Sequence, residues 1–238
     1  MAQKTVWLPE LGEVVLSKRR GTRNIRLSVS ASGRIRVGLP NWVPYSAGIS
    51  FALSRKEWLL KHKAKVEPQL LGDGDRIGKS YRLRFKQDLS LKRTSTRLVD
   101  NEIIVKSPLS YSDQSVQSAA KLAAERALRQ EAEELLPLRL SDLAKKHGFR
   151  YQSVKIKKMT SRWGSCSAQR LITLNFYLMQ LPWPLIDHVL LHELVHTKHL
   201  NHSAAFWMEF EYIYPGAKKT RKQIHNYRPV INTLAVDM

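Results

Sequence analysis

The sequence contains the segment HELVHTKHLNH, which begins at His192 and ends at His202. Its first five residues follow the HExxH pattern, in which His192 and His196 are four positions apart. On a helix this spacing places two imidazoles on one face, one turn apart, where both reach a single metal ion. Glu193 can then lie beside a metal-coordinated water rather than on the metal. The segment therefore predicts a helix that carries two metal ligands and one acid–base residue.

This arrangement predicts hydrolytic chemistry. A Zn²⁺ ion held by three protein ligands keeps one position for water and lowers the pKa of that water to about 7. Glu193 would take the proton as the water attacks its substrate. We therefore expect Zn²⁺ as the cofactor and a hydrolase, and we favour a peptidase acting on a peptide or protein substrate. The alternative is a core helix whose histidines only hydrogen-bond to their neighbours.

The third metal ligand that we favour is His202. It lies six residues after His196, so it can return to the metal only if the helix ends first. Asn201 tolerates the left-handed conformation of a helix terminus and can supply that turn. The rival third ligand is a glutamate on the next predicted helix, Glu209 or Glu211, as in thermolysin-like proteins.

Two further histidines, His188 and His199, lie near the same helical stripe. His188 and His196 are about 12 Å apart along the axis, and zinc–nitrogen bonds are only about 2.0–2.1 Å, so the helix can donate only a neighbouring pair. We interpret His188 and His199 as residues around the metal site or as ordinary, partly exposed histidines. The histidine spacing matches the metzincin pattern HExxHxxGxxH, but His199 occupies the glycine position, so we do not assign that class.

Length and composition indicate a globular protein. The chain has 238 residues, enough for one or two domains with a proper core. No apolar run reaches the roughly 18 residues of a membrane span, and the first residues lack the apolar core of a secretory signal. Cys166 is the single cysteine, so an intrachain disulfide is impossible. These features predict a cytoplasmic protein without a membrane partner.

The formal net charge is +20. Residues 1–112 carry 22 Lys and Arg against 9 Asp and Glu, a balance of +13, and residues 113–238 carry 18 against 11, a balance of +7. Such an excess favours association with polyanions, so a nucleic acid or nucleotide is a possible partner. The alternative, which we favour, is a solvated basic surface, since no aromatic-rich basic motif for nucleic acid stands out.

Residues 1–110 have the pattern of a β-rich region with one helix. Alternating apolar residues predict five strands, at 25–29, 35–39, 81–85, 91–98 and 103–105. Turn residues at 32–33 and 100–101 indicate hairpins. An amphipathic pattern predicts the single helix, from 44 to 63.

Residues 111–238 form the second predicted domain. Helix formers predict a helix over 115–136, which Pro137 interrupts and which continues over 138–146 to a stop at Gly148. Strands are predicted at 151–159 and 170–176, before the metal helix. A last helix runs from Ser203, a suitable N-cap, to about residue 212.

Three segments in a fixed order carry a resemblance to a known family. They are SRWGSCS at 161–167, the following RLITLNF, and HELVHTKHLNHSAAFW. This combination resembles the YgjP-like family of metal-dependent hydrolases and, more distantly, the SprT and WLM groups of zincin-fold peptidases. The resemblance implies an α+β fold, in which a β-rich N-terminal part precedes a zincin-like catalytic domain. It also implies zinc at His192, His196 and His202, with Glu193 as the base.

The WGSC segment supplies candidates for substrate binding. Gly164 and Ser165 allow a tight loop before a strand, and a strand beside the metal helix can pair with an extended peptide. Arg162 could bind a substrate carboxylate or phosphate, and Trp163 could line the site. The alternative is that Trp163 packs in the core and Arg162 faces solvent. Cys166 could be a regulatory thiolate, but a small buried residue explains it more simply.

Two other functions compete with a peptidase. The first is a metal-dependent nucleotide pyrophosphate hydrolase, since some members of the families that the chain resembles are associated with that reaction. The second is a nucleic-acid-associated protein with zinc but no catalysis, although structural zinc sites are usually rich in cysteine. A peptidase also needs a group that stabilises the oxyanion. His225, Tyr227 and Tyr214 are the candidates.

Overall fold

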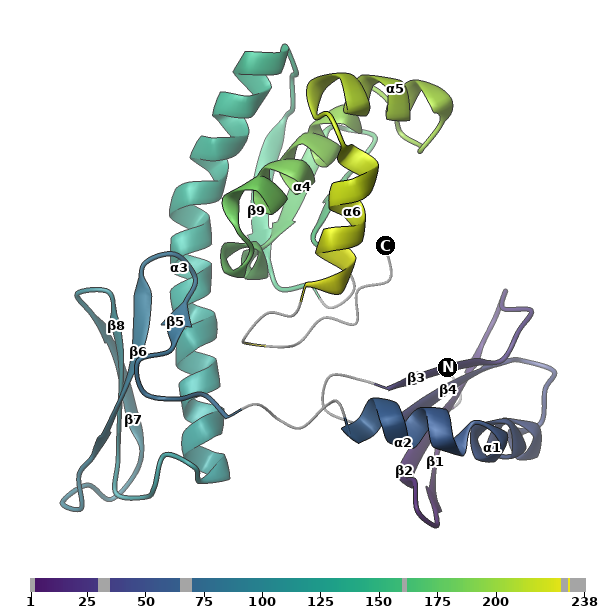
Figure 1. Cartoon of the computed structure of the whole chain (residues 1–238), viewed down its shortest axis with the longest axis vertical. Coiled ribbons are helices and arrows are strands. Elements are labelled where there is room, and N and C mark those ends of the chain that lie inside the picture. Colours follow the sequence, from purple (N-terminus) through teal and green to yellow (C-terminus); the bar gives the residue numbers. More distant parts are fainter. Residues whose placement is uncertain (1–2, 30–34, 65–69, 160–161, 228–230, 232–238) are drawn as a thin grey trace. The chain divides into compact units, whose positions relative to one another are not determined.

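A computed structural model describes residues 3–29, 35–64, 70–159, 162–227 and 231, apart from the side chains of 62–64, 225 and 226. The chain divides into two compact units, Met1–Gln69 and Leu70–Met238 (Figure 1). The mixed α+β class and the β-rich N-terminal region are confirmed. No helix in the described part is long and apolar enough to cross a membrane.

The first unit is a four-stranded sheet with two helices. Its strands are β1 (Gln3–Leu8), β2 (Gly12–Arg19), β3 (Arg26–Val29) and β4 (Ile35–Pro40), in the order β1-β2-β4-β3. The predicted pairing of β3 with β4 is confirmed and is antiparallel, while its turn at 32–33 lies outside the described residues. The single helix predicted over 44–63 is wrong, because Arg55 leaves helical geometry and separates α1 (Tyr45–Ser54) from α2 (Lys56–Ala64).

The second unit is organised around one long helix, α3 (Gln114–His147). The Asp113 side chain caps its start, and Gly148 ends it in the left-handed conformation that glycine adopts readily. The predicted interruption at Pro137 does not occur. Leu136 and Leu140 are fully buried on either side of the proline and hold the helix against the core.

Two sheets pack against different parts of α3 (Figure 1). The first consists of β5 (Arg76–Ile77), β6 (Tyr81–Gln87), β7 (Ser95–Val99) and β8 (Glu102–Ser107), in the order β5-β6-β8-β7. The predicted turn at 100–101 joins β7 to β8, and both of its residues have positive φ. By packing, residues 70–110 therefore belong to the same unit as α3, although the domain boundary predicted from the sequence lies at 110–111.

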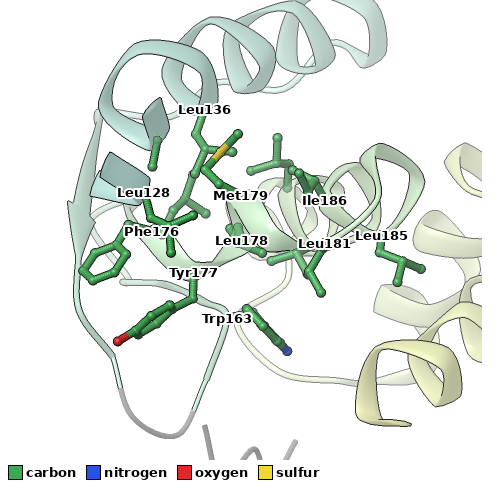
Figure 2. Close-up of a cluster of buried hydrophobic side chains, with 14 of the residues drawn as sticks. Leu128, Leu136, Trp163, Phe176, Tyr177, Leu178, Met179, Leu181, Leu185 and Ile186 are labelled. Carbon is green, nitrogen blue, oxygen red and sulfur yellow. The ribbon is translucent and has the colours of Figure 1, made fainter. Parts of the chain in front are cut away.

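The second sheet consists of β9 (Ser153–Lys157), β10 (Gly164–Cys166) and β11 (Leu171–Asn175), in the order β10-β11-β9. The 3₁₀ helix η1 (Phe176–Gln180) follows it, and then come α4 (Trp183–Val195), α5 (Ala204–Ile213) and α6 (Ala217–Asn226). Trp163, Tyr177 and Leu178 belong to the buried cluster that joins this sheet to α3 and α4 (Figure 2). Helix α4 contacts α3, β10, α5 and α6, so the predicted metal helix lies at the centre of this part of the fold.

Candidate metal centre

Helix α4 presents the HExxH residues at its C-terminal end. Pro184 lies in its first turn, where a missing N–H is tolerated. The helix ends at Val195, and His196 is its C-cap with helical backbone angles. The left-handed turn predicted at Asn201 is wrong, because Asn201 is not among the described residues with positive φ. The chain instead turns through Thr197, whose backbone N–H and hydroxyl both donate to the carbonyl of Leu194.

Three histidine side chains converge beyond this turn. The Nε2 atom of His192 lies 3.2 Å from Nε2 of His196 and 3.1 Å from Nε2 of His202. Among the described residues, this is the one group of three or more His, Cys, Asp or Glu side chains whose ligand atoms converge, all within 4.8 Å of one another. His202 is therefore brought to the pair on α4, as its spacing predicts.

The rival ligands have other partners. Glu209 accepts from the Lys198 ammonium at 2.6 Å and from Nε2 of His199 at 2.7 Å. Glu211 accepts from the backbone N–H of Gly216 at 2.6 Å. Neither glutamate belongs to the convergent group.

The protonation of the three histidines suits a metal ion. Burial, followed by the charges of His196 and His202, lowers the pKa of His192 to about 2. Burial also lowers the pKa values of His196 and His202. The Nδ1–H group of His196 donates to the carbonyl of His199 at 2.8 Å, which directs the Nε2 lone pair toward the cluster. Three neutral imidazoles facing one another are a donor set that fits zinc and other divalent transition metals.

An aromatic wall surrounds the histidines. Phe206 and Phe210 are fully buried, and their rings lie 5.0 and 5.5 Å from the ring of His192. His188 is buried between Phe210 and Tyr214, and it is not a partly exposed residue. Burial, followed by the charge of Arg221, lowers the pKa of His188 to about 4. His192 and His196 are partly buried beside this wall, while His202 is exposed to solvent.

Glu193 is buried between α4 and β10. Its side chain is packed against Gly164, and its Oε2 atom has no hydrogen-bond partner among the described residues. Burial raises the pKa of Glu193 to about 8, partly opposed by the charge of Arg162. A carboxyl group whose pKa is shifted in this way, beside a cluster of potential ligands, is typical of acid–base sites.

The WGSC residues divide into different roles. Trp163 is 1% exposed and lies in the core (Figure 2), which does not suit a substrate contact. Arg162 is exposed, and Ser165 points to the face of β10 opposite Gly164 because strand residues alternate. Burial, followed by the charge of Glu193, raises the pKa of the Cys166 thiol to about 11, so the thiol stays protonated near neutral pH.

Two of the three residues predicted to stabilise the oxyanion already donate their hydroxyl hydrogen bonds to backbone carbonyls. The hydroxyl of Tyr214 donates to the carbonyl of Pro184 at 3.0 Å, and that of Tyr227 donates to the carbonyl of Gln180 at 2.8 Å. The side chain of the third candidate, His225, lies outside the described part.

Sequence reasoning missed two residues near the site. Asn175 is fully buried, and its amide donates to the carbonyls of Met159 and Arg162, which fixes the chain entering β10. Arg221 on α6 places a positive charge near the histidines. Asn175 lies one residue before the end of the strand predicted over 170–176, and asparagine there is a signal for a cap, whereas no local pattern singles out Arg221 among the basic residues around it.

Comparison with known proteins identifies the family of the chain. The family model described as "YgjP-like, metallopeptidase domain" matches residues 23–227. This chain belongs to the YgjP-like metallopeptidase family. The resemblance found in the sequence is thereby confirmed, and the YgjP-like match spans both compact units. No curated protein matches the chain.

Two solved structures are similar to part of this YgjP-like chain. The metallopeptidase zymogen abylysin of Pyrococcus abyssi is 28% identical, with a TM-score of 0.34, and the match covers 36% of this chain and 88% of that one. The metallopeptidase zymogen jannalysin of Methanocaldococcus jannaschii is 22% identical, with a TM-score of 0.33 and the same two coverages.

Proposed function

We propose that this YgjP-like protein is a zinc-dependent peptidase. In this proposal His192, His196 and His202 hold Zn²⁺, and Glu193 is the general base. The observation that carries it is the convergence of the Nε2 atoms of these three histidines. The residue that follows His192 in the sequence is Glu193, a buried carboxyl group whose pKa is raised. Membership of a metallopeptidase family supports the choice of a peptide bond as the substrate.

Zinc, when bound, supplies a Lewis acid that polarises the scissile carbonyl, lowers the pKa of a coordinated water to about 7, and favours the carboxylate form of a neighbouring acid. Glu193 takes one proton from the attacking water as the new C–O bond forms. Its protonated carboxyl then gives that proton to the amine nitrogen as the C–N bond breaks. The same group must therefore accept a proton in the first half of this cycle and release it in the second.

Strand β10 is suited to hold the substrate backbone. In the described part of the chain it pairs only with β11, so no strand is paired with its other edge, and β10 also contacts α4. An extended peptide can add to such an edge through backbone hydrogen bonds. Gly164 and Cys166 on this strand lie next to Glu193, which would bring a peptide paired with β10 to the proposed base. Arg162, two residues before the strand, is exposed and could contact the same peptide.

The two competing functions would use the same histidine cluster but would need different groups around it. A nucleotide pyrophosphate hydrolase would need groups that hold phosphates, and a non-catalytic zinc protein would bind nucleic acid through the basic surface. The experiment is a screen of zinc-loaded, chelated and zinc-restored protein against unfolded proteins, short peptides, nucleoside triphosphates and nucleic acid. Zinc-dependent cleavage of peptide bonds alone is the expected result. Zinc-dependent release of pyrophosphate, or nucleic-acid binding without any hydrolysis, would contradict the proposal.

A further inference from the structure

Two cations of α6 lie over an aromatic ring beside the histidine cluster. The Arg221 guanidinium is 5.7 Å and the Lys218 ammonium 5.9 Å from the ring centre of Trp207 on α5. The ring of Trp207 is in turn 6.0 Å from the ring of His202. The tryptophan therefore holds two positive charges at the open, solvent-exposed side of the proposed metal site.

These two charges have no acidic partner in the described part of the chain. No ion pair involves Arg221 or Lys218, although both are exposed and free to reach one. The nearest glutamates along the chain, Glu209 and Glu211, are already bound to other groups. A guanidinium stacked on an aromatic ring keeps its N–H donors in its own plane, where they remain available to a ligand.

The positive charge of Arg221 lies close to the proposed metal site, because Arg221 is over the ring of Trp207 and that ring is 6.0 Å from the ring of His202. A bound divalent cation would add to this positive field. An anionic group on the substrate is therefore attracted to this side, and a cationic group is repelled.

We propose that Arg221, stacked on Trp207 and assisted by Lys218, forms a subsite that binds a carboxylate of the peptide substrate. This inference rests on the proposed peptidase function and names the substrate class that it prefers. A guanidinium offers paired N–H donors that match the two oxygens of a carboxylate. That carboxylate belongs either to the C-terminus of a peptide or to an acidic side chain near the scissile bond.

Peptide binding tests the subsite without relying on turnover. The probes are fluorescently labelled short peptides of alanine and leucine, made with a free C-terminus, with a C-terminal amide, and as amides with one internal Asp or Asn. They are titrated into the full-length, zinc-loaded Glu193→Gln protein at low and high salt. One carboxylate form is expected to bind about tenfold or more tightly than its neutral match, as for a charge-assisted hydrogen bond. Preference for the free C-terminus or for Asp identifies the source of the carboxylate.

Variants on α6 assign this preference to Arg221. Arg221→Gln should abolish the preference for the carboxylate at unchanged zinc content, and Arg221→Lys should restore part of it. The matched control is Lys222→Gln, because Lys222 is exposed on the same helix and is not one of the cations over Trp207. The preference should persist in this control.

Three results would overturn the subsite, and they differ from failure of the proposed function. Equal affinity for acid and amide peptides, or a preference that survives in Arg221→Gln, excludes a carboxylate contact with Arg221. An equal fall in turnover of acid and amide peptides in an otherwise wild-type Arg221→Gln enzyme would place Arg221 at the reacting carbonyl instead. Absence of zinc-dependent cleavage of every peptide by the wild-type enzyme would overturn the peptidase function itself.

Discussion

A Cβ atom added to Gly164 would lie 2.6 Å from Oε1 of Glu193 and 2.8 Å from its Cγ. Gly164 does not have a positive φ, so the glycine is required for space and not for its backbone conformation. The contact joins the start of β10 to the last turns of α4 and fixes the proposed base against the backbone of a strand.

Gly164→Ala should therefore lower catalytic efficiency while leaving zinc bound. The new methyl group must displace the Glu193 carboxyl group, and a displacement of about 1 Å can cost roughly 100-fold in rate. Peptide hydrolysis and zinc content, measured together, check this. Gly72→Ala is the matched control, since its added Cβ would meet nothing closer than 3.6 Å. Unchanged kcat/KM in Gly164→Ala would show that the position of Glu193 is not critical.

His202→Ala should weaken zinc binding by more than about 100-fold, because loss of a direct ligand exceeds the 10- to 100-fold cost of losing a residue that only orients one. Glu209→Ala is the control and should retain zinc, since Glu209 contacts Lys198 and His199 instead. Competition with a chromophoric chelator measures both affinities. Tight zinc binding in His202→Ala together with its loss in Glu209→Ala would reverse the ligand assignment.

His188 should make the protein sensitive to acid. Its folded-state pKa is about 4, below the ordinary value of 6.5, because burial favours the neutral ring. Between these values the unfolded chain takes up a proton that the folded chain does not. The stabilising contribution is therefore complete above pH 6.5 and is lost as the pH falls toward 4. The full change is on the order of 3 kcal/mol.

His188→Leu removes this titration and should flatten the pH dependence of stability. The free energy of unfolding by urea, measured for both chelated proteins at pH 7.5, 6 and 5, gives the comparison. The wild type should lose more stability than the variant as the pH falls. Parallel pH curves would mean that His188 is protonated equally well in both states.

The helical part of the site could be predicted from the sequence, because a spacing of four residues is enough to bring His192 and His196 to one face of a helix. The spacing also predicts His202, but the left-handed turn expected at Asn201 does not form. The chain turns at Thr197 through bonds to the carbonyl of Leu194, and Asn201 keeps a negative φ. A turn made by backbone bonds leaves no characteristic residue in the sequence.

Contacts between distant segments could not be predicted. The role of Gly164 depends on how β10 packs against α4, and the role of Arg221 depends on how α6 packs beside α5. Trp163 also shows this limit, since an aromatic residue near a motif can line a site or fill the core equally well, and here it fills the core. In the same way, packing overrides local propensity where α3 continues through Pro137.

In the proposed mechanism Glu193 acts as a base and not as a metal ligand. Turnover of an unfolded protein substrate by zinc-replete Glu193→Gln tests it most directly, because glutamine keeps the size of the side chain and removes the proton acceptor. The variant should bind zinc as the wild type does and hydrolyse about 100- to 10,000-fold more slowly, the range typical of general acid–base catalysis. Turnover close to the wild-type rate at equal zinc content would contradict the claim.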